Sequence, residues 1–184
     1  MLTFFYDENH LTLKNGKEKL SLAWPAVAVS ISGIRYEAIT AASKPVLKEN
    51  SLVQKFCNKD LEFEVKLTNH GTFLRKELVI CSEKDFPTPD YVEVDAQFIP
   101  NEKFVSCGYR STAKKITSES AEEEGKGLMP GCGYPLIGKK IFVGLEHPAA
   151  FNLIKNDSDN EDAYYLRHFP QWKNGVLESV TAAL

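Results

Sequence analysis

Hydrophobic and polar residues alternate from Leu61 to Thr68, where Phe63, Val65 and Leu67 share one face and charged residues occupy the other. A period of two is that of a β-strand with one buried face. The following Asn-His-Gly signals a turn, and the run from Phe73 to Cys81 is again rich in β-forming residues. The pattern therefore predicts an antiparallel hairpin.

A second alternating run extends from Tyr91 to Phe98, between a Pro-Thr-Pro-Asp breaker and a further proline. Strict alternation assigns four residues to its core face: Val92, Val94, Ala96 and Phe98. Further short β-forming runs lie upstream at residues 2–6, 10–13, 20–24, 26–31, 34–40 and 46–48. Because no window keeps a helical apolar period, the chain is predicted to be all-β. Many short strands between turns favour a two-sheet antiparallel sandwich, with residues 1–184 as a single domain.

Two polar segments interrupt this pattern, near residues 111–130 and at 155–162. The first has three consecutive glutamates and almost nothing to bury, and the second is dense in aspartate. Both are predicted to be exposed loops. The second lacks the glycine and the twelfth-position glutamate of an EF-hand, so we expect no calcium there.

Composition narrows the expected environment and partners. The chain has 184 residues and a net charge of −3, which provides no field to attract nucleic acid. No apolar run is long enough to span a membrane, and the N-terminus does not read as a signal peptide. We therefore expect a cytoplasmic protein, or an extracellular or periplasmic one if a leader precedes Met1.

The four cysteines, at positions 57, 81, 107 and 132, have no spacing typical of a metal site. They favour buried free thiols, with a disulfide pair as the alternative in an oxidising compartment. We expect no metal and no cofactor.

The most distinctive segment extends from Gly131 to Pro148. It contains a glycine-rich turn, a β-run interrupted by Gly144, and a final Glu146-His147-Pro148. A glycine within a strand marks a bulge or a close approach of another group. Because neighbouring residues on a strand point to opposite faces, Glu146 and His147 are expected to diverge.

The sequence Phe142-Val143-Gly144-Leu145-Glu146-His147-Pro148, after its Gly-Tyr-Pro turn, resembles the N-terminal β-supersandwich domain of α-galactosidase-like (melibiase-related) glycoside hydrolases. The resemblance is strongest over residues 91–148, is weaker over 164–184, and is limited to strand rhythm before residue 91. It implies a galactose mutarotase-like supersandwich. In such enzymes the catalytic carboxylates belong to a (β/α)8 barrel, which this chain is too short to contain.

The expected function is that of a non-catalytic N-terminal module that shapes or positions a carbohydrate substrate. Its partners would be a carbohydrate, a catalytic barrel domain or partner chain, and in addition other copies of this chain. Three alternatives stay open: a free-standing carbohydrate-binding sandwich, a structural or protein-interaction sandwich, and a small independent enzyme.

Candidate ligand-binding residues are Glu146, His147, Tyr134 and Trp172, and no catalytic residue is predicted. The acid and the imidazole could recognise sugar hydroxyls, and the aromatic rings could stack on a sugar. Each also has a structural interpretation: Glu146 could bond backbone groups of nearby turns, and the aromatic residues, like Trp24, could pack in the core. A mutarotase mechanism would need a second histidine and a base carboxylate in one cleft, and His70 and His168 are the candidates for the histidine.

Overall fold

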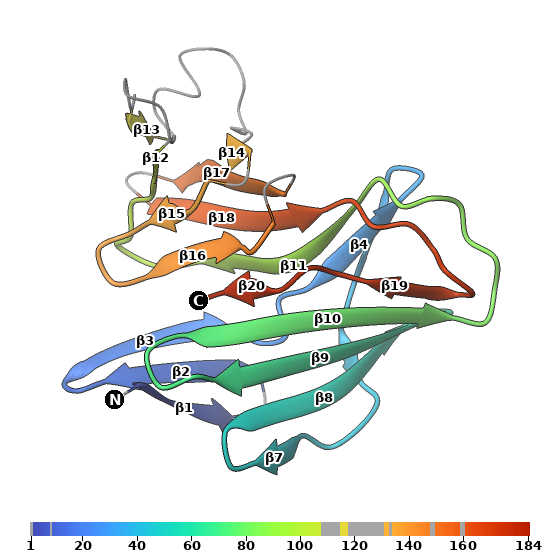
Figure 1. The fold of residues 1–184 in the computed structure, drawn as a ribbon, viewed down its shortest axis with the longest axis horizontal. Coiled ribbons are helices and arrows are strands. Elements are labelled where there is room, and N and C mark those ends of the chain that lie inside the picture. The colour runs from blue at the N-terminus through green and yellow to red at the C-terminus, as the bar shows by residue number, and fades with distance from the viewer. Residues whose placement is uncertain are drawn as a thin grey trace.

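The computed structural model describes residues 2–7, 9–107, 115–117, 131–132, 134–147, 150–158 and 161–184. These residues form three sheets (Figure 1), and all the strand pairs between them are antiparallel. No helix in this part of the chain is long and apolar enough to cross a membrane. The prediction of an all-β antiparallel sandwich is confirmed.

The largest sheet has 11 strands and is centred on the long β8–β9–β10 meander. Its strands are β6 (Thr40–Ala41), β7 (Val46–Lys48), β8 (Ser51–Asn58), β9 (Leu61–Asn69), β10 (Leu74–Ser82), β12 (Val105–Cys107), β13 (Lys115–Thr117), β15 (Leu136–Ile137), β16 (Phe142–Leu145), β19 (Val176–Glu178) and β20 (Ala182–Ala183). The predicted hairpin is β9–β10, and its alternation holds because Phe63, Val65 and Leu67 are completely buried. Strand β20 returns from the C-terminal end of the chain to pair with both β10 and β16.

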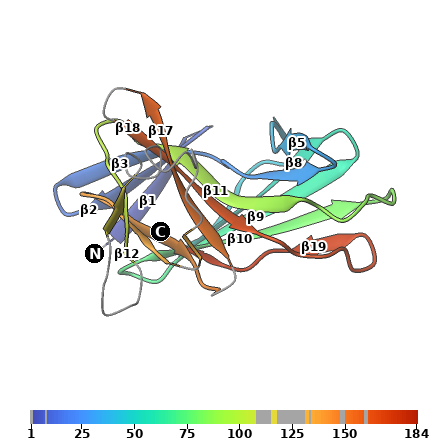
Figure 2. The ribbon, with the colours of Figure 1, turned by 90° about the horizontal axis from the view of Figure 1, so that it is seen from above.

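The second sheet has six strands in the order β14-β17-β18-β11-β4-β5. Their bounds are β4 (Ala28–Ile31), β5 (Ile34–Glu37), β11 (Tyr91–Phe98), β14 (Gly131–Cys132), β17 (Phe151–Ser158) and β18 (Glu161–His168). A three-stranded sheet of β1 (Leu2–Asp7), β2 (His10–Asn15) and β3 (Glu18–Ala23) lies at one end of the molecule (Figure 2). One cluster of buried apolar side chains includes residues from all three sheets.

A buried polar network joins the two larger sheets. The ammonium group of Lys76 on β10 contacts the Asp95 carboxylate on β11, and the Tyr164 hydroxyl donates a hydrogen bond to the same carboxylate. Burial lowers the pKa of Lys76, although the nearby Asp95 charge opposes this shift, and burial raises the pKa of Tyr164. The side-chain amide of Gln97 also donates to Asp95, at 3.1 Å. Three donors therefore satisfy a carboxylate that has no access to water.

Strand β11 differs from the strict alternation that the sequence predicts. Val92 and Val94 are buried as expected, but the register shifts at a β-bulge between Glu93 and Asp95. Beyond the bulge Asp95 and Gln97 turn inward, while Ala96 is half-buried and Phe98 is 43% exposed. The assignment of Ala96 and Phe98 to the core is wrong, because one extra residue in a strand reverses which face the later residues occupy.

The two predicted loops have different outcomes. Most of segment 111–130 lies outside the described residues. Segment 155–162, in contrast, continues the β17–β18 hairpin, where Lys155 pairs with Ala163 and Asn156 with Asp162. Asp162 is fully buried and accepts a hydrogen bond from the Phe104 backbone N–H at 3.0 Å. The described residues of this segment therefore form strands and not a loop, and Asp162 is buried where a solvated residue was expected, whereas Lys155 is exposed.

Two further predictions concern cysteine and glycine. Cys57 and Cys81 are free thiols that are half-buried, whereas the side chains of Cys107 and Cys132 lie outside the described residues. Gly144 on β16 is a point of close approach, as predicted. A Cβ atom there would lie 3.4 Å from both the Asn152 side-chain nitrogen and the Pro135 Cα atom.

Candidate functional site

Charged and aromatic side chains gather on the outer face of the six-stranded sheet. Strand register places Glu93 of β11 opposite Arg167 of β18 on one side and Ala28 of β4 on the other. Ala28 in turn lies opposite Glu37 of β5. Because the alanine between them is small, side chains from β5 can reach across β4 to β11.

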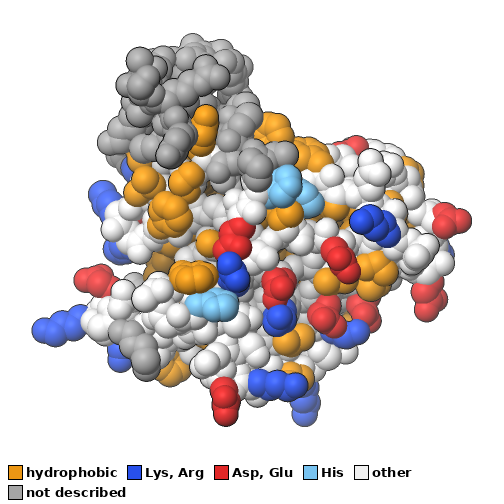
Figure 3. Space-filling model, in the orientation of Figure 1, with side chains coloured by type: hydrophobic (Ala, Val, Ile, Leu, Met, Phe, Trp, Pro, Cys, Tyr) orange, Lys and Arg blue, Asp and Glu red, His pale blue; other side chains and the backbone are white. Residues whose placement is uncertain are grey.

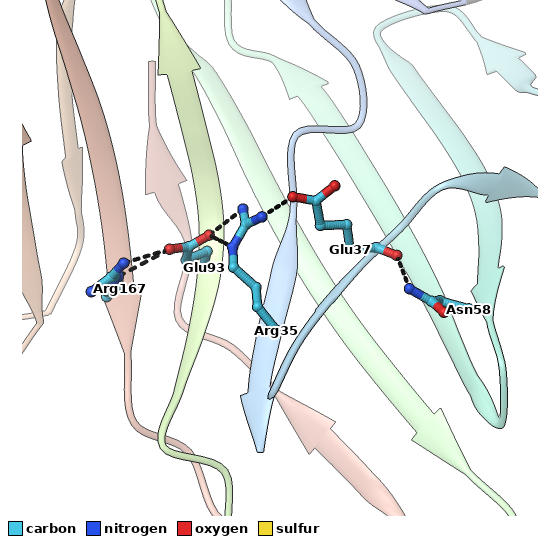
Figure 4. A network of polar contacts seen from close by, with 5 residues as sticks. All are labelled: Arg35, Glu37, Asn58, Glu93 and Arg167. Carbon is cyan, nitrogen blue, oxygen red and sulfur yellow. Dashed lines mark hydrogen bonds and ion pairs between the residues drawn. The ribbon is translucent and has the colours of Figure 1, made fainter. Parts of the chain in front are cut away.

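Glu93 is the centre of this arrangement (Figure 4), since two arginines bind its two carboxylate oxygens. Oε2 accepts hydrogen bonds from Nε and Nη2 of Arg35 at 2.9 and 2.6 Å. Oε1 accepts from Nε and Nη2 of Arg167 at 3.0 and 2.8 Å. Each guanidinium directs two N–H groups at a single carboxylate oxygen, and such charge-assisted hydrogen bonds are stronger than neutral ones. Glu93 has no exposed surface, so these four donors replace the water that it has lost.

Neighbouring groups fix the two arginines in place. Nη1 of Arg35 donates to the exposed carboxylate of Glu37, and the Glu37 backbone carbonyl accepts a hydrogen bond from Asn58 on β8 at 2.8 Å (Figure 4). The Arg167 guanidinium lies over the ring of Tyr91, 4.0 Å from its centroid, and 5.4 Å from that of Tyr165. Stacking on tyrosine holds an arginine without using its N–H donors.

The β4–β5 turn sets the position of Arg35. The Asp90 carboxylate, just before β11, accepts hydrogen bonds from the Gly33 backbone N–H and the Ser30 hydroxyl, each at 2.8 Å. The Gly33 bond, followed by the Ser30 bond, lowers the pKa of Asp90. Gly33 has a φ of +75°, a left-handed conformation that suits glycine.

A groove of about 510 Å³ runs along this face from the arginines toward Lys155. Tyr165, Ala96 and Ala163 lie along it, and the exposed Phe98 and Lys155 lie toward its other end. Small alanines leave the space, and the β11 bulge turns Ala96 and Phe98 toward it. The groove therefore combines an aromatic ring, guanidinium donors and the carboxylate acceptor of Glu37. None of the hydrogen bonds between described residues uses Nη1 of Arg167, so this nitrogen retains two donors for a ligand.

The residues selected from the sequence lie elsewhere. Glu146 is exposed, and its Oε1 accepts a hydrogen bond from Nε of Arg75 at 3.0 Å. The Glu146 side chain is thus bonded to an arginine on β10. The structural interpretation of Glu146 in the sequence analysis had backbone groups of nearby turns as its partners. Tyr134 is half-buried, and its backbone carbonyl accepts a hydrogen bond from the Asn152 side chain at 2.7 Å.

Trp172 is half-buried in the segment between β18 and β19. Its ring stacks on Phe86 with centroids 6.1 Å apart, and its Nε1 donates to the Pro87 carbonyl at 2.9 Å. Trp24 is a core residue, only 5% exposed, whose Nε1 donates to the Gln54 side chain at 2.9 Å.

His147 lies beside His168, with ring centroids 5.6 Å apart. Burial, followed by the charge of His147, lowers the pKa of His168. His70 is not part of this pair, because it stacks on Phe73 instead, at 5.0 Å. The structure thus brings together two of the three histidines that the sequence suggested.

Comparison with known proteins gives limited information. No family model and no curated protein matches the sequence. Among solved structures, the chain is similar to a galactose mutarotase related enzyme from Lactobacillus acidophilus. The TM-score is 0.47 at 10% identity, over 100% of this chain and 96% of the other. Because this likeness is so low, the function has to be argued from the residues of the groove.

Proposed function

We propose that this protein is a non-catalytic carbohydrate-binding β-sandwich that holds a sugar in the groove between Arg167 and Lys155. The observation that carries the proposal is the Arg35–Glu93–Arg167 cluster beside an open groove with aromatic walls. Sugars present hydroxyl groups, which both donate and accept hydrogen bonds, and apolar C–H faces, which pack on aromatic rings. Arg167 supplies donors, Glu37 supplies an acceptor, and Tyr165 and Phe98 supply rings.

The same geometry argues against glycoside hydrolysis in the groove. Hydrolysis of this kind ordinarily uses two carboxyl groups, one of which gives or takes a proton. Among the described residues that line the groove, only Glu37 and Glu93 carry a carboxyl group. Each oxygen of Glu93 accepts two arginine N–H bonds, which leaves no free lone pair facing the groove.

We further propose that the sandwich serves as the N-terminal module of a glycoside hydrolase. The resemblance of the segment around Gly144 to α-galactosidase-like enzymes supports this proposal. Reading the natural gene past the codon for Leu184 tests it directly. A reading frame that continues into a (β/α)8 barrel would support the module, whereas a stop codon with no barrel encoded nearby would favour a free-standing carbohydrate-binding protein.

Calorimetric titration with a panel of methyl galactosides and glucosides tests binding. We expect saturable binding of at least one sugar and about tenfold weaker binding by Arg167→Gln, since a hydrogen bond from a charged group is lost. Arg75→Gln is the matched control, because Arg75 also pairs with a glutamate but lies outside the groove. Silence across the panel, or equal weakening by both variants, would contradict the proposal. Release of nitrophenol from nitrophenyl galactosides or glucosides would contradict its non-catalytic part.

A further inference from the structure

A second hollow lies between the β2–β3 hairpin and strand β16. It has a volume of about 430 Å³, within the range of about 300–1,000 Å³ that is typical of small-molecule sites. Its lining is mostly apolar and includes residues from the three-stranded sheet, the β9–β10 turn, β16 and β20. Figure 3 shows hydrophobic side chains gathered over β15 and β16, at the edge of this hollow. None of its residues belongs to the carbohydrate groove.

The apolar walls are well defined by strand pairing. Leu13 and Leu20 face each other across β2 and β3 and both line the hollow. Ile141 and Leu184 are almost completely buried beside it, whereas Phe142 is 54% exposed. An exposed phenylalanine at the mouth of an apolar hollow is available to cover an apolar ligand.

Of the described residues that line the hollow, three have charged side chains: Glu18, Lys19 and Lys140. The remaining polar lining residues, Asn15 and Thr72, are neutral. None of the ion pairs between described residues involves Glu18 or either lysine. The side chains that line the hollow therefore carry one surplus positive charge, opposite in sign to the side-chain net charge of −3 of the whole chain.

We propose that this hollow binds a medium-chain alkyl carboxylate, with the chain against Leu13, Leu20 and Phe142 and the carboxylate toward the lysines. Burial of the alkyl chain supplies most of the affinity, and the lysines select the sign of the head group. This site does not depend on carbohydrate binding, because the two sites share no residue.

Chain length and head group test the proposal by titration calorimetry with hexanoate, octanoate and decanoate. We expect affinity to rise about fourfold per methylene group until the hollow is full. Octanol and octylamine should bind less tightly than octanoate, by about fivefold for the alcohol, and added salt should reduce the difference. The proposal is overturned if affinity does not rise with chain length, or if octanol binds as tightly as octanoate.

Two variants with matched controls place the ligand. Phe142→Ala should weaken octanoate binding about tenfold, whereas Phe5→Ala, at a similarly exposed phenylalanine that does not line the hollow, should leave it unchanged. Lys140→Gln should weaken octanoate binding but not octanol binding, and Lys173→Gln should change neither. Equal effects of a variant and its control would place the ligand elsewhere and overturn the proposal.

Discussion

At the scale of single residues, burial distinguishes two glutamates that both pair with arginine. Glu93 is inaccessible to solvent and binds two arginines, whereas Glu146 is exposed and binds one. We expect Glu93→Ala to lower the free energy of unfolding by about 3–5 kcal/mol, because it leaves Arg35 and Arg167 uncompensated. Glu146→Ala should cost less than about 1 kcal/mol. Urea unfolding of both variants measures the difference, and equal losses would show that burial of Glu93 does not matter.

His168 should make stability depend on pH. Burial and the neighbouring His147 hold its pKa below the ordinary value of about 6.5 in the folded protein. As the pH falls below about 6.5, the unfolded chain therefore binds more protons at this residue than the folded chain does, and stability is lost. The free energy of unfolding should decrease less steeply over this range in His168→Gln. Urea unfolding of both proteins at several pH values measures this free energy. Identical slopes against pH would contradict the assignment of the pH dependence to His168.

At the scale of elements, the bulge in β11 decides which side chains face the core. Gln97 bonds both the backbone N–H and the carbonyl of Ala23, at 2.8 and 2.9 Å, whereas Phe98 is 43% exposed. Gln97→Leu should therefore cost about 2 kcal/mol, because it leaves backbone groups unpaired. Phe98→Gln should cost no more than about 0.5 kcal/mol. Thermal unfolding of the two variants checks that Gln97→Leu costs more stability than Phe98→Gln. If β11 alternated without a bulge, Phe98→Gln would cost more.

The same strand explains how far the sequence could predict the site. Alternation placed β9 correctly because this strand keeps an unbroken period of two with one face buried, whereas β10 was predicted from its β-forming residues. It failed beyond Glu93 because a bulge leaves no signal in the order of polar and apolar residues. The sequence did place a charged residue at position 93, but the arginines that bind Glu93 lie 58 and 74 residues away. Only the strand order of the sheet brings them together.

The histidine pair illustrates the same limit. His147 follows β16 and His168 ends β18, and the sequence shows both residues without indicating that they meet. The aromatic candidates Tyr134 and Trp172 were selected for residue type alone. Type does not reveal that Trp172 stacks on Phe86 rather than standing free on a sheet face.

At the scale of the whole molecule, the sheets share one core and are expected to unfold together. The buried cluster includes Leu13 of the three-stranded sheet, Phe63 of the largest sheet and Tyr164 of the six-stranded sheet. The Lys76–Asp95 contact joins the two larger sheets through the same interior. Tryptophan fluorescence and far-UV circular dichroism should therefore report one coincident urea transition. Two separated transitions would show that the sheets form independent units.

The central claim is that a sugar binds in the groove on the outer face of the six-stranded sheet. Amide NMR spectra recorded during titration with the tightest sugar of the panel test it most directly. We predict saturable shifts at Ala96, Phe98, Tyr165 and Arg167, and none at Glu146 or Trp172. Shifts confined to Glu146, His147 or Trp172, or the absence of saturable shifts, would contradict the account.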